Sequence, residues 1–119
     1  MLDFAIGMRS TTDTVMSSIQ TGFTQVFSAA SYTESLGWNT HPFSTPFFWD
    51  GVSNIIVETC FNNSGFTNNA GVNQTIMPYN ATIYFRADAP GVCASTTSSG
   101  TFTNRPNMQF GFLATTGTD

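Results

Sequence analysis

The segment LDFAIGM, residues 2–8, alternates large apolar residues with smaller ones. The large residues share one face of an extended chain, and they are Leu2, Phe4, Ile6 and Met8. The other face carries Asp3, Ala5 and Gly7. A period of two residues is typical of a β-strand with one buried side. The segment therefore predicts a strand, and it decides the fold class because the same pattern returns along the chain.

Two further segments in the first half of the chain show the strand pattern. FTQVFSA, residues 23–29, alternates with both faces partly apolar, which suits a strand packed between layers. VSNIIVETCF, residues 52–61, is the most apolar stretch, and it follows the tight-turn signal of Asp50 and Gly51. Residues 15–19 allow either a second strand or a short helical turn.

The second half of the chain predicts shorter strands between long polar loops. Residues 74–87, QTIMPYNATIYFRA, are expected to form a strand pair, or one long strand bent at Pro78. RPNMQFGFL, residues 105–113, predicts a closing strand with Met108, Phe110 and Phe112 on one face. The Asn-rich and Gly-rich residues 62–73 and the residues 88–104 are expected to be loops.

Residues 36–51, LGWNTHPFSTPFFWDG, interrupt the strand pattern. Pro42 and Pro46 each remove a backbone donor, so this segment is expected to be an edge strand or a crossover between two sheets. Six to eight short strands separated by turns predict an all-β fold, an antiparallel β-sandwich with jelly-roll or Greek-key connections. A small barrel is the structural alternative. At 119 residues, the chain is expected to be a single domain, residues 1–119.

The composition excludes some partners. Only 8% of the residues are charged, three of them Lys or Arg, and the net charge is −4. Nucleic acids and anionic membrane surfaces need clustered cations, so neither is expected as a partner. No apolar run approaches the roughly 18 to 20 residues that cross a bilayer. The first residues do not resemble a secretory signal, and we expect the chain to be a module of a larger extracellular protein.

Cys60 and Cys93 are the two cysteines of the chain. Two thiols with the single His41 remote in sequence make a poor zinc site, so a disulfide is the favoured interpretation. A disulfide indicates an oxidising compartment and hence export. The alternative is two separate buried thiols that act as small apolar residues.

Several quoted segments together resemble a known kind of module. The stretch GWNTHPFSTPFFWDGVSNIIVETCFNN (residues 37–63), a second cysteine and RPNMQFGF (residues 105–112) are similar to a β-sandwich module of large cell-surface and secreted proteins of Bacteroidetes. These proteins are often exported by the type IX secretion system. FAIGMRSTT (residues 4–12) and TGFTQVF (residues 21–27) extend the resemblance over nearly the whole chain. The resemblance implies an extracellular setting and a domain type, and it carries over no catalytic residue.

Aromatic residues are the candidate ligand contacts. Trp38 and Trp49 flank the proline-rich segment, and exposed aromatic faces stack on sugar rings. Tyr32 and Tyr79 lie beside polar residues, a mixture that suits saccharide binding. The competing interpretation is that such rings form the core, which applies most strongly to Phe43, Phe47 and Trp49 as a group.

A calcium site is the candidate metal centre. Asp50, Asn54 and Glu58 offer oxygen ligands close together in sequence, and structural calcium occurs in sandwich modules. Their spacing does not match an EF-hand loop, and turn formation alone explains Asp50 and Gly51. No other cofactor is expected.

Catalytic patterns are weak in this sequence. His41 is the single histidine and no G-x-S-x-G elbow occurs, so a hydrolase triad is not indicated. We therefore expect a non-catalytic extracellular module for adhesion, with polysaccharide or glycoprotein as the most concrete ligand. The alternative is a structural repeat or subunit of a stalk or filament that associates with neighbouring copies through sheet edges carrying few charges.

Overall fold

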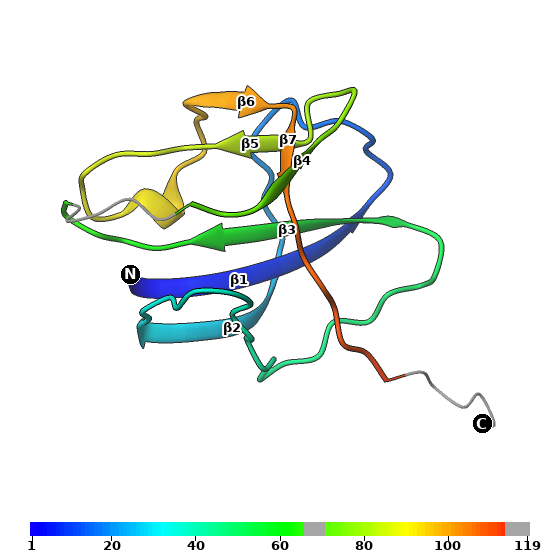
Figure 1. The fold of residues 1–119 in the computed structure, drawn as a ribbon. Helices are drawn as coiled ribbons and strands as arrows, with labels where there is room; N and C mark the ends of the chain where they lie inside the picture. The colour runs from blue at the N-terminus through cyan, green and yellow to red at the C-terminus, as the bar shows by residue number, and fades with distance from the viewer. Residues whose placement is uncertain (66–70, 114–119) are drawn as a thin grey trace.

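The computed structural model describes residues 1–65 and 71–113. In these two ranges the chain forms strands and one short 3₁₀ helix (Figure 1). The elements in chain order are β1 (Leu2–Thr11), β2 (Thr24–Ser31), β3 (Asn54–Cys60), β4 (Gln74–Ile76), β5 (Thr82–Tyr84), η1 (Val92–Ala94), β6 (Gly100–Phe102) and β7 (Asn104–Pro106). The all-β prediction is confirmed.

The main sheet has the order β2-β1-β3 and is antiparallel throughout. β1 lies in the centre, where Ile6 pairs with Phe27 on one side and Met8 pairs with Val57 on the other. A register shift between Ile6 and Gly7 marks a bulge in the pairing with β2. The strands predicted within residues 2–8, 23–29 and 52–61 are therefore confirmed.

The later strands form two small sheets, β4-β7 and β5-β6. Residues 74–87 contain two strands and not one bent strand, but β4 and β5 do not pair with each other, because each pairs with a later strand. The observed pairing does not confirm a closed sandwich with jelly-roll or Greek-key connections.

The buried core is small and belongs to the main sheet. Alternate residues of β1, Phe4, Ile6 and Met8, pack with Val26 of β2, and these four side chains are buried. Ile55 and Val57 of β3 pack against this cluster from the same face. Of the apolar side chains that the structure describes in β4, β5, β6 and β7, none is buried. The alternation in residues 2–8 therefore builds the core, and the two small sheets add little to it.

The crossover between β2 and β3 follows the proline-rich segment. Residues 41–50 form no strand. The amides of Ser44 and Thr45 donate to the carbonyl oxygen of Val26, and Phe47 packs against the core. The segment is therefore not an edge strand, and it joins two strands of one sheet instead of crossing between two sheets as predicted. Its hydrogen bonds to Val26 place it beside β2.

Three further predictions need correction. Residues 88–104, expected to be a loop, contain η1, β6 and the first residue of β7. Residues 15–19 form neither a strand nor a helical turn, and residues 107–113 form no strand although their apolar residues alternate. A strand needs a partner with free backbone groups as well as a period of two, and residues 108–113 have none in the part of the chain that is described. Residues 66–70 of the predicted 62–73 loop lie outside the described residues.

Candidate contact surface

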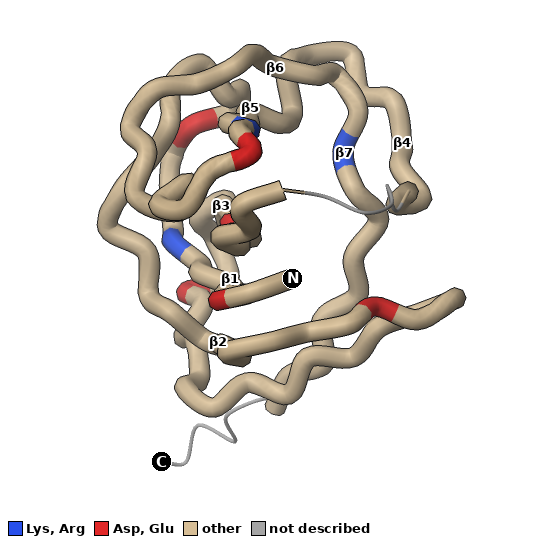
Figure 2. The backbone as a smooth tube through the Cα atoms, turned by 90° about the vertical axis from the view of Figure 1, so that its left-hand side faces the viewer, with Lys and Arg blue, Asp and Glu red and all other residues tan. Residues whose placement is uncertain are grey.

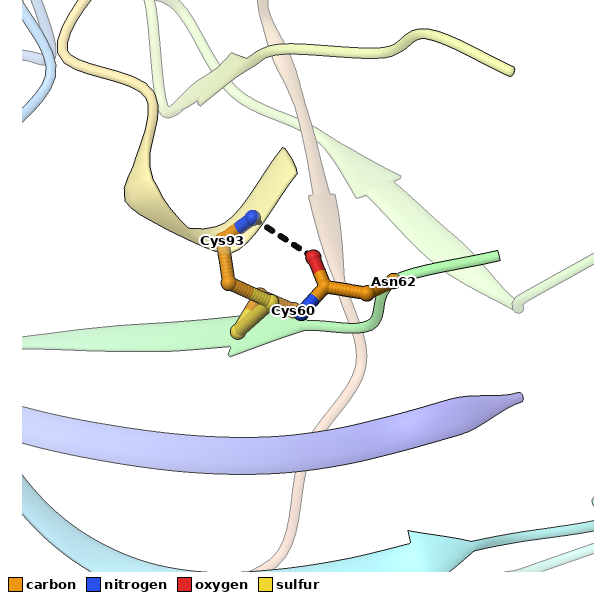
Figure 3. The surroundings of a disulfide bond; sticks show 3 residues. All are labelled: Cys60, Asn62 and Cys93. Atoms are coloured by element: carbon orange, nitrogen blue, oxygen red, sulfur yellow. Dashed lines mark hydrogen bonds between the residues drawn. A yellow bond between two sulfur atoms is a disulfide. The ribbon is translucent and has the colours of Figure 1, made fainter. Parts of the chain in front are cut away.

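The disulfide joins Cys60, the last residue of β3, to Cys93 in η1 (Figure 3). The Cα atoms are 5.4 Å apart, and the bond spans 33 positions of sequence. The amide of Cys93 also donates to Oδ1 of Asn62 at 3.0 Å. These contacts fix the connection between β5 and β6 to the end of the main sheet, and the predicted disulfide is confirmed.

Tyr32 lies in an aromatic cluster against the core. Its ring stacks on Phe4 with 5.1 Å between centroids and lies 4.9 Å from His41. Its amide donates to the carbonyl oxygen of Met1, and its hydroxyl donates to Asn39. Tyr32 is half-buried, and its ring has packing partners on more than one side. This placement favours a structural role over a ligand contact.

His41 completes this cluster. Its ring lies 5.1 Å from Phe27, and its Nδ1 atom is buried without a hydrogen-bond partner among the residues described. Burial lowers the pKa of His41 below its ordinary value of 6.5. The imidazole therefore packs as a member of the aromatic cluster.

Trp38 lies on a loop whose backbone is hydrogen-bonded to the Asn39 side chain. The Asn39 side chain accepts from the amide of Ser35 at 2.9 Å and donates to the carbonyl oxygens of Ser35 and Gly37. The Trp38 side chain is 63% exposed, and Leu36 on the same loop is fully exposed. The loop thus presents two apolar side chains to solvent on a backbone held by the Asn39 side chain.

Trp49 is held by the turn that precedes β3. Its indole Nε1 donates to the carbonyl oxygen of Ser53 at 2.8 Å, and its side chain remains 57% exposed. The Asp50 carboxylate accepts hydrogen bonds from the Ser53 hydroxyl and from the amides of Ser53 and Val52. These bonds lower the pKa of Asp50 to about 2. Trp49 is therefore an exposed ring in a fixed orientation beside a charged carboxylate.

The structure does not bring Trp38 and Trp49 together. The loop of Trp38 is tied to Tyr32, next to Met1, whereas the turn of Trp49 leads into Asn54, which pairs with Thr11. These two places are the opposite ends of β1 (Figure 1), ~30 Å apart at about 3.3 Å per strand residue. One sugar ring cannot contact both indoles. Tyr79, half-buried between β4 and β5, belongs to neither loop.

The calcium candidates are also dispersed. The carboxylate of Asp50 is occupied by turn hydrogen bonds, and the Asn54 amide nitrogen donates to the carbonyl oxygen of Asp13. Glu58 lies four residues further along β3, about 13 Å from Asn54 in an extended strand. In the ranges 1–65 and 71–113, no group of three or more His, Cys, Asp or Glu side chains is arranged to hold a metal ion.

Glu58 lines a shallow hollow on the face of the main sheet away from the core. The hollow has a volume of about 310 Å³, and its floor includes the small residues Ala5 and Gly7. Partial burial raises the pKa of the Glu58 carboxyl. Phe23 also borders the hollow. It lies close to Gly7, where an added Cβ would be 2.8 Å from the Phe23 Cβ atom.

The surface of the described chain exposes many large apolar side chains. Sixteen large apolar residues of the described chain are more than 40% exposed, against four that are buried. Four of the most exposed are Val52, Ile76, Phe112 and Leu113, at 76 to 96%. Aromatic rings account for about 900 Å² of this surface at ~200 Å² per ring. The composition shows that the chain has few charges, but it does not show which apolar side chains are exposed, because that depends on which strands pair with one another.

Strand edges are the second feature of this surface. β3 pairs with β1 on one side only, and β5 pairs with β6 on one side only. Charges are sparse along the backbone (Figure 2), since β3 carries Glu58 and β2, β4, β5 and β6 carry none. A long, uncharged edge is a template for strand pairing. β2 is the other edge of the main sheet and is one residue longer, but the amides of Ser44 and Thr45 donate to its Val26 carbonyl oxygen. Among the described residues, β3 is therefore the longest edge strand without such a backbone contact on its outer side.

In comparisons with protein-family models, curated proteins and solved structures, nothing matches the chain. Among the residues described, no helix has the length and apolar character needed to cross a bilayer.

Proposed function

We propose that this protein is a non-catalytic extracellular module that acts by associating with other β-structure, as an adhesive domain or as a subunit of a stalk or filament. The observation that carries the proposal is the imbalance between sixteen exposed and four buried large apolar side chains. Large apolar side chains are the ones most often buried in a folded monomer, so a chain that exposes four times as many as it buries has apolar side chains available to a partner.

The open edge of β3 and the disulfide support the same proposal. An unpaired edge of seven residues with a single charge favours strand addition. The Cys60–Cys93 disulfide is compatible with an extracellular location, where such bonds persist. A complete sandwich would then arise in the assembly, when a neighbour covers the apolar faces of the small sheets.

Sedimentation velocity over a wide concentration range tests association. We expect the mean sedimentation coefficient of the purified protein to rise with concentration. A single monomer boundary at all concentrations would contradict the proposal.

A second candidate function is carbohydrate binding at the turn of Trp49. The specific observation is the fixed indole, tied through Nε1 to Ser53, with its exposed ring beside the charged Asp50. A glycan array tests it, with Trp49→Ala as the variant and Trp38→Ala as the matched control at the other end of β1. A signal that Trp49→Ala abolishes and Trp38→Ala retains supports this site. A silent array, or a signal that both variants retain, contradicts it.

A further inference from the structure

Residues 107–113 have the sequence of a strand, but none of them belongs to a strand in the described chain. Their base is fixed, since the Asn107 amide donates to Asn73 and the Thr75 hydroxyl donates to Asn107 Oδ1. Beyond Asn107 the segment crosses in front of the main sheet (Figure 1) and belongs to no strand. Phe110 is 49% exposed and Phe112 is 85% exposed.

Among residues 1–65 and 71–113, no strand pairs with β3 on the side away from β1. In both views β5 and β6 lie beyond it (Figures 1 and 2), and neither is hydrogen-bonded to it as a strand. An incoming element must therefore be narrow, a single extended segment rather than a second sheet. β3 and the 107–113 segment each have seven residues, so each is about 23 Å long when extended.

We propose that residues 107–113 of one copy pair with the outer edge of β3 in a second copy. This inference rests on the proposed association and names the two surfaces that carry it. Repetition of the same contact from copy to copy is heterologous and builds a chain of subunits.

Antiparallel pairing matches the two segments face by face. If Phe110 lies opposite Val57, then Phe112 lies opposite Ile55, and both aromatic rings extend the core face of the main sheet. Gln109 then lies opposite Glu58 on the other face, where its amide can donate to the half-buried carboxylate. In the parallel direction, Gly111 would lie opposite Glu58 and offer no side-chain donor.

The charge of the 107–113 segment and the surface area that it can bury are both compatible with pairing to β3 of a second copy. Residues 104–113 carry Arg105 and no acidic residue, whereas the acceptor sheet presents Asp3 and Glu58 and the chain as a whole carries a charge of −4. The apolar side chains of the segment expose about 500 Å², given ~200 Å² for each fully exposed aromatic ring. Burial of an equal area on the acceptor gives about 1,000 Å², which reaches the lower range of specific interfaces.

Sedimentation velocity of three full-length proteins tests this contact. We expect the double variant Phe110→Ser/Phe112→Ser to associate about tenfold or more weakly than the unchanged protein. The matched control is Leu36→Ser/Val15→Ser, which removes two exposed apolar side chains elsewhere and should associate as the unchanged protein does. Oligomers that persist in the first variant would overturn this contact and leave the proposed association standing. A monomer in all three proteins would overturn both.

A charge series at Gln109 tests the register. Opposite Glu58, Gln109→Lys should strengthen association and Gln109→Glu should weaken it, because opposite and like charges across a strand pair act in these directions. Adding Glu58→Lys to Gln109→Glu should restore association. If both substitutions at Gln109 have the same effect, the proposed pairing is wrong.

Discussion

Removal of the disulfide should destabilise this fold about as much as loss of a whole core side chain. The Cys60–Cys93 bond spans 33 positions, and chain entropy gives about 3.7 kcal/mol of stabilisation at 25 °C for a loop of that length. The four buried side chains contribute about 1.5–3 kcal/mol each, so the cross-link equals a large fraction of the whole core.

The perturbation is the double variant Cys60→Ser/Cys93→Ser, and the assay is urea unfolding followed by far-UV circular dichroism at low protein concentration. With an m-value of about 1–3 kcal/mol/M, the midpoint should fall by about 1 M or more. Asn62→Ala is the control, because it removes the hydrogen bond to the Cys93 amide but keeps the cross-link. It should cost about 1 kcal/mol. A midpoint in the double variant within about 0.3 M of the unchanged protein would refute the reasoning, since the fold would then not depend on the loop constraint.

Three further predictions concern single side chains. Gly7→Ala should cost about 1–3 kcal/mol, because the new Cβ would lie 2.8 Å from Cβ of Phe23, and Phe23→Gly in the same chain, which removes that atom, should recover part of the loss in urea unfolding. Burial lowers the pKa of His41 in the folded state, so as the pH falls the unfolded chain binds the proton first. The free energy of unfolding should therefore fall as the pH drops below 6.5, and His41→Gln should flatten that decline. An unchanged slope in the variant would show that His41 is not its cause. Burial raises the pKa of Glu58 in the folded state from 4.5, so the free energy of unfolding should fall as the pH rises from 4.5 through the raised pKa. Glu58→Gln should therefore be more stable than the unchanged protein at pH 7. Equal melting temperatures of the two proteins at pH 7 would contradict this prediction.

The main sheet could be predicted from sequence because its signals are local. Alternation in residues 2–8 gave the central strand and the buried Phe4, Ile6 and Met8. The apolar run at 52–61 gave β3, and the two cysteines gave the disulfide. In each case the residue pattern and the tertiary environment act in the same direction.

The remaining predictions failed where the outcome depends on distant partners. Residues 107–113 alternate as residues 2–8 do, yet they lack a ladder to join. β4 and β5 were expected to be paired neighbours or one strand, but each bonds a strand about 20 to 30 residues further on. Pairing at that distance is not encoded in local periodicity.

The candidate site shows the same limit. Tyr32 has a polar sequence environment, but its contacts with Met1 and Phe4 arise where the ends of β1 and β2 meet, and its contact with His41 arises from the crossover that follows β2. Trp38 and Trp49 are close in sequence, and the crossover between them runs the length of the main sheet. Short sequence separation therefore gave no information on whether the two rings share a ligand.

Hydrogen exchange of the β3 amides, measured in dilute and in concentrated protein, tests the central claim most directly. Amides of residues 54–60 that point toward β1 should be protected at both concentrations, and those on the outer edge should become protected only in the concentrated sample, together with residues 107–113. Exchange on the outer edge that is fast at every concentration, or protected equally at all of them, would contradict association through this strand.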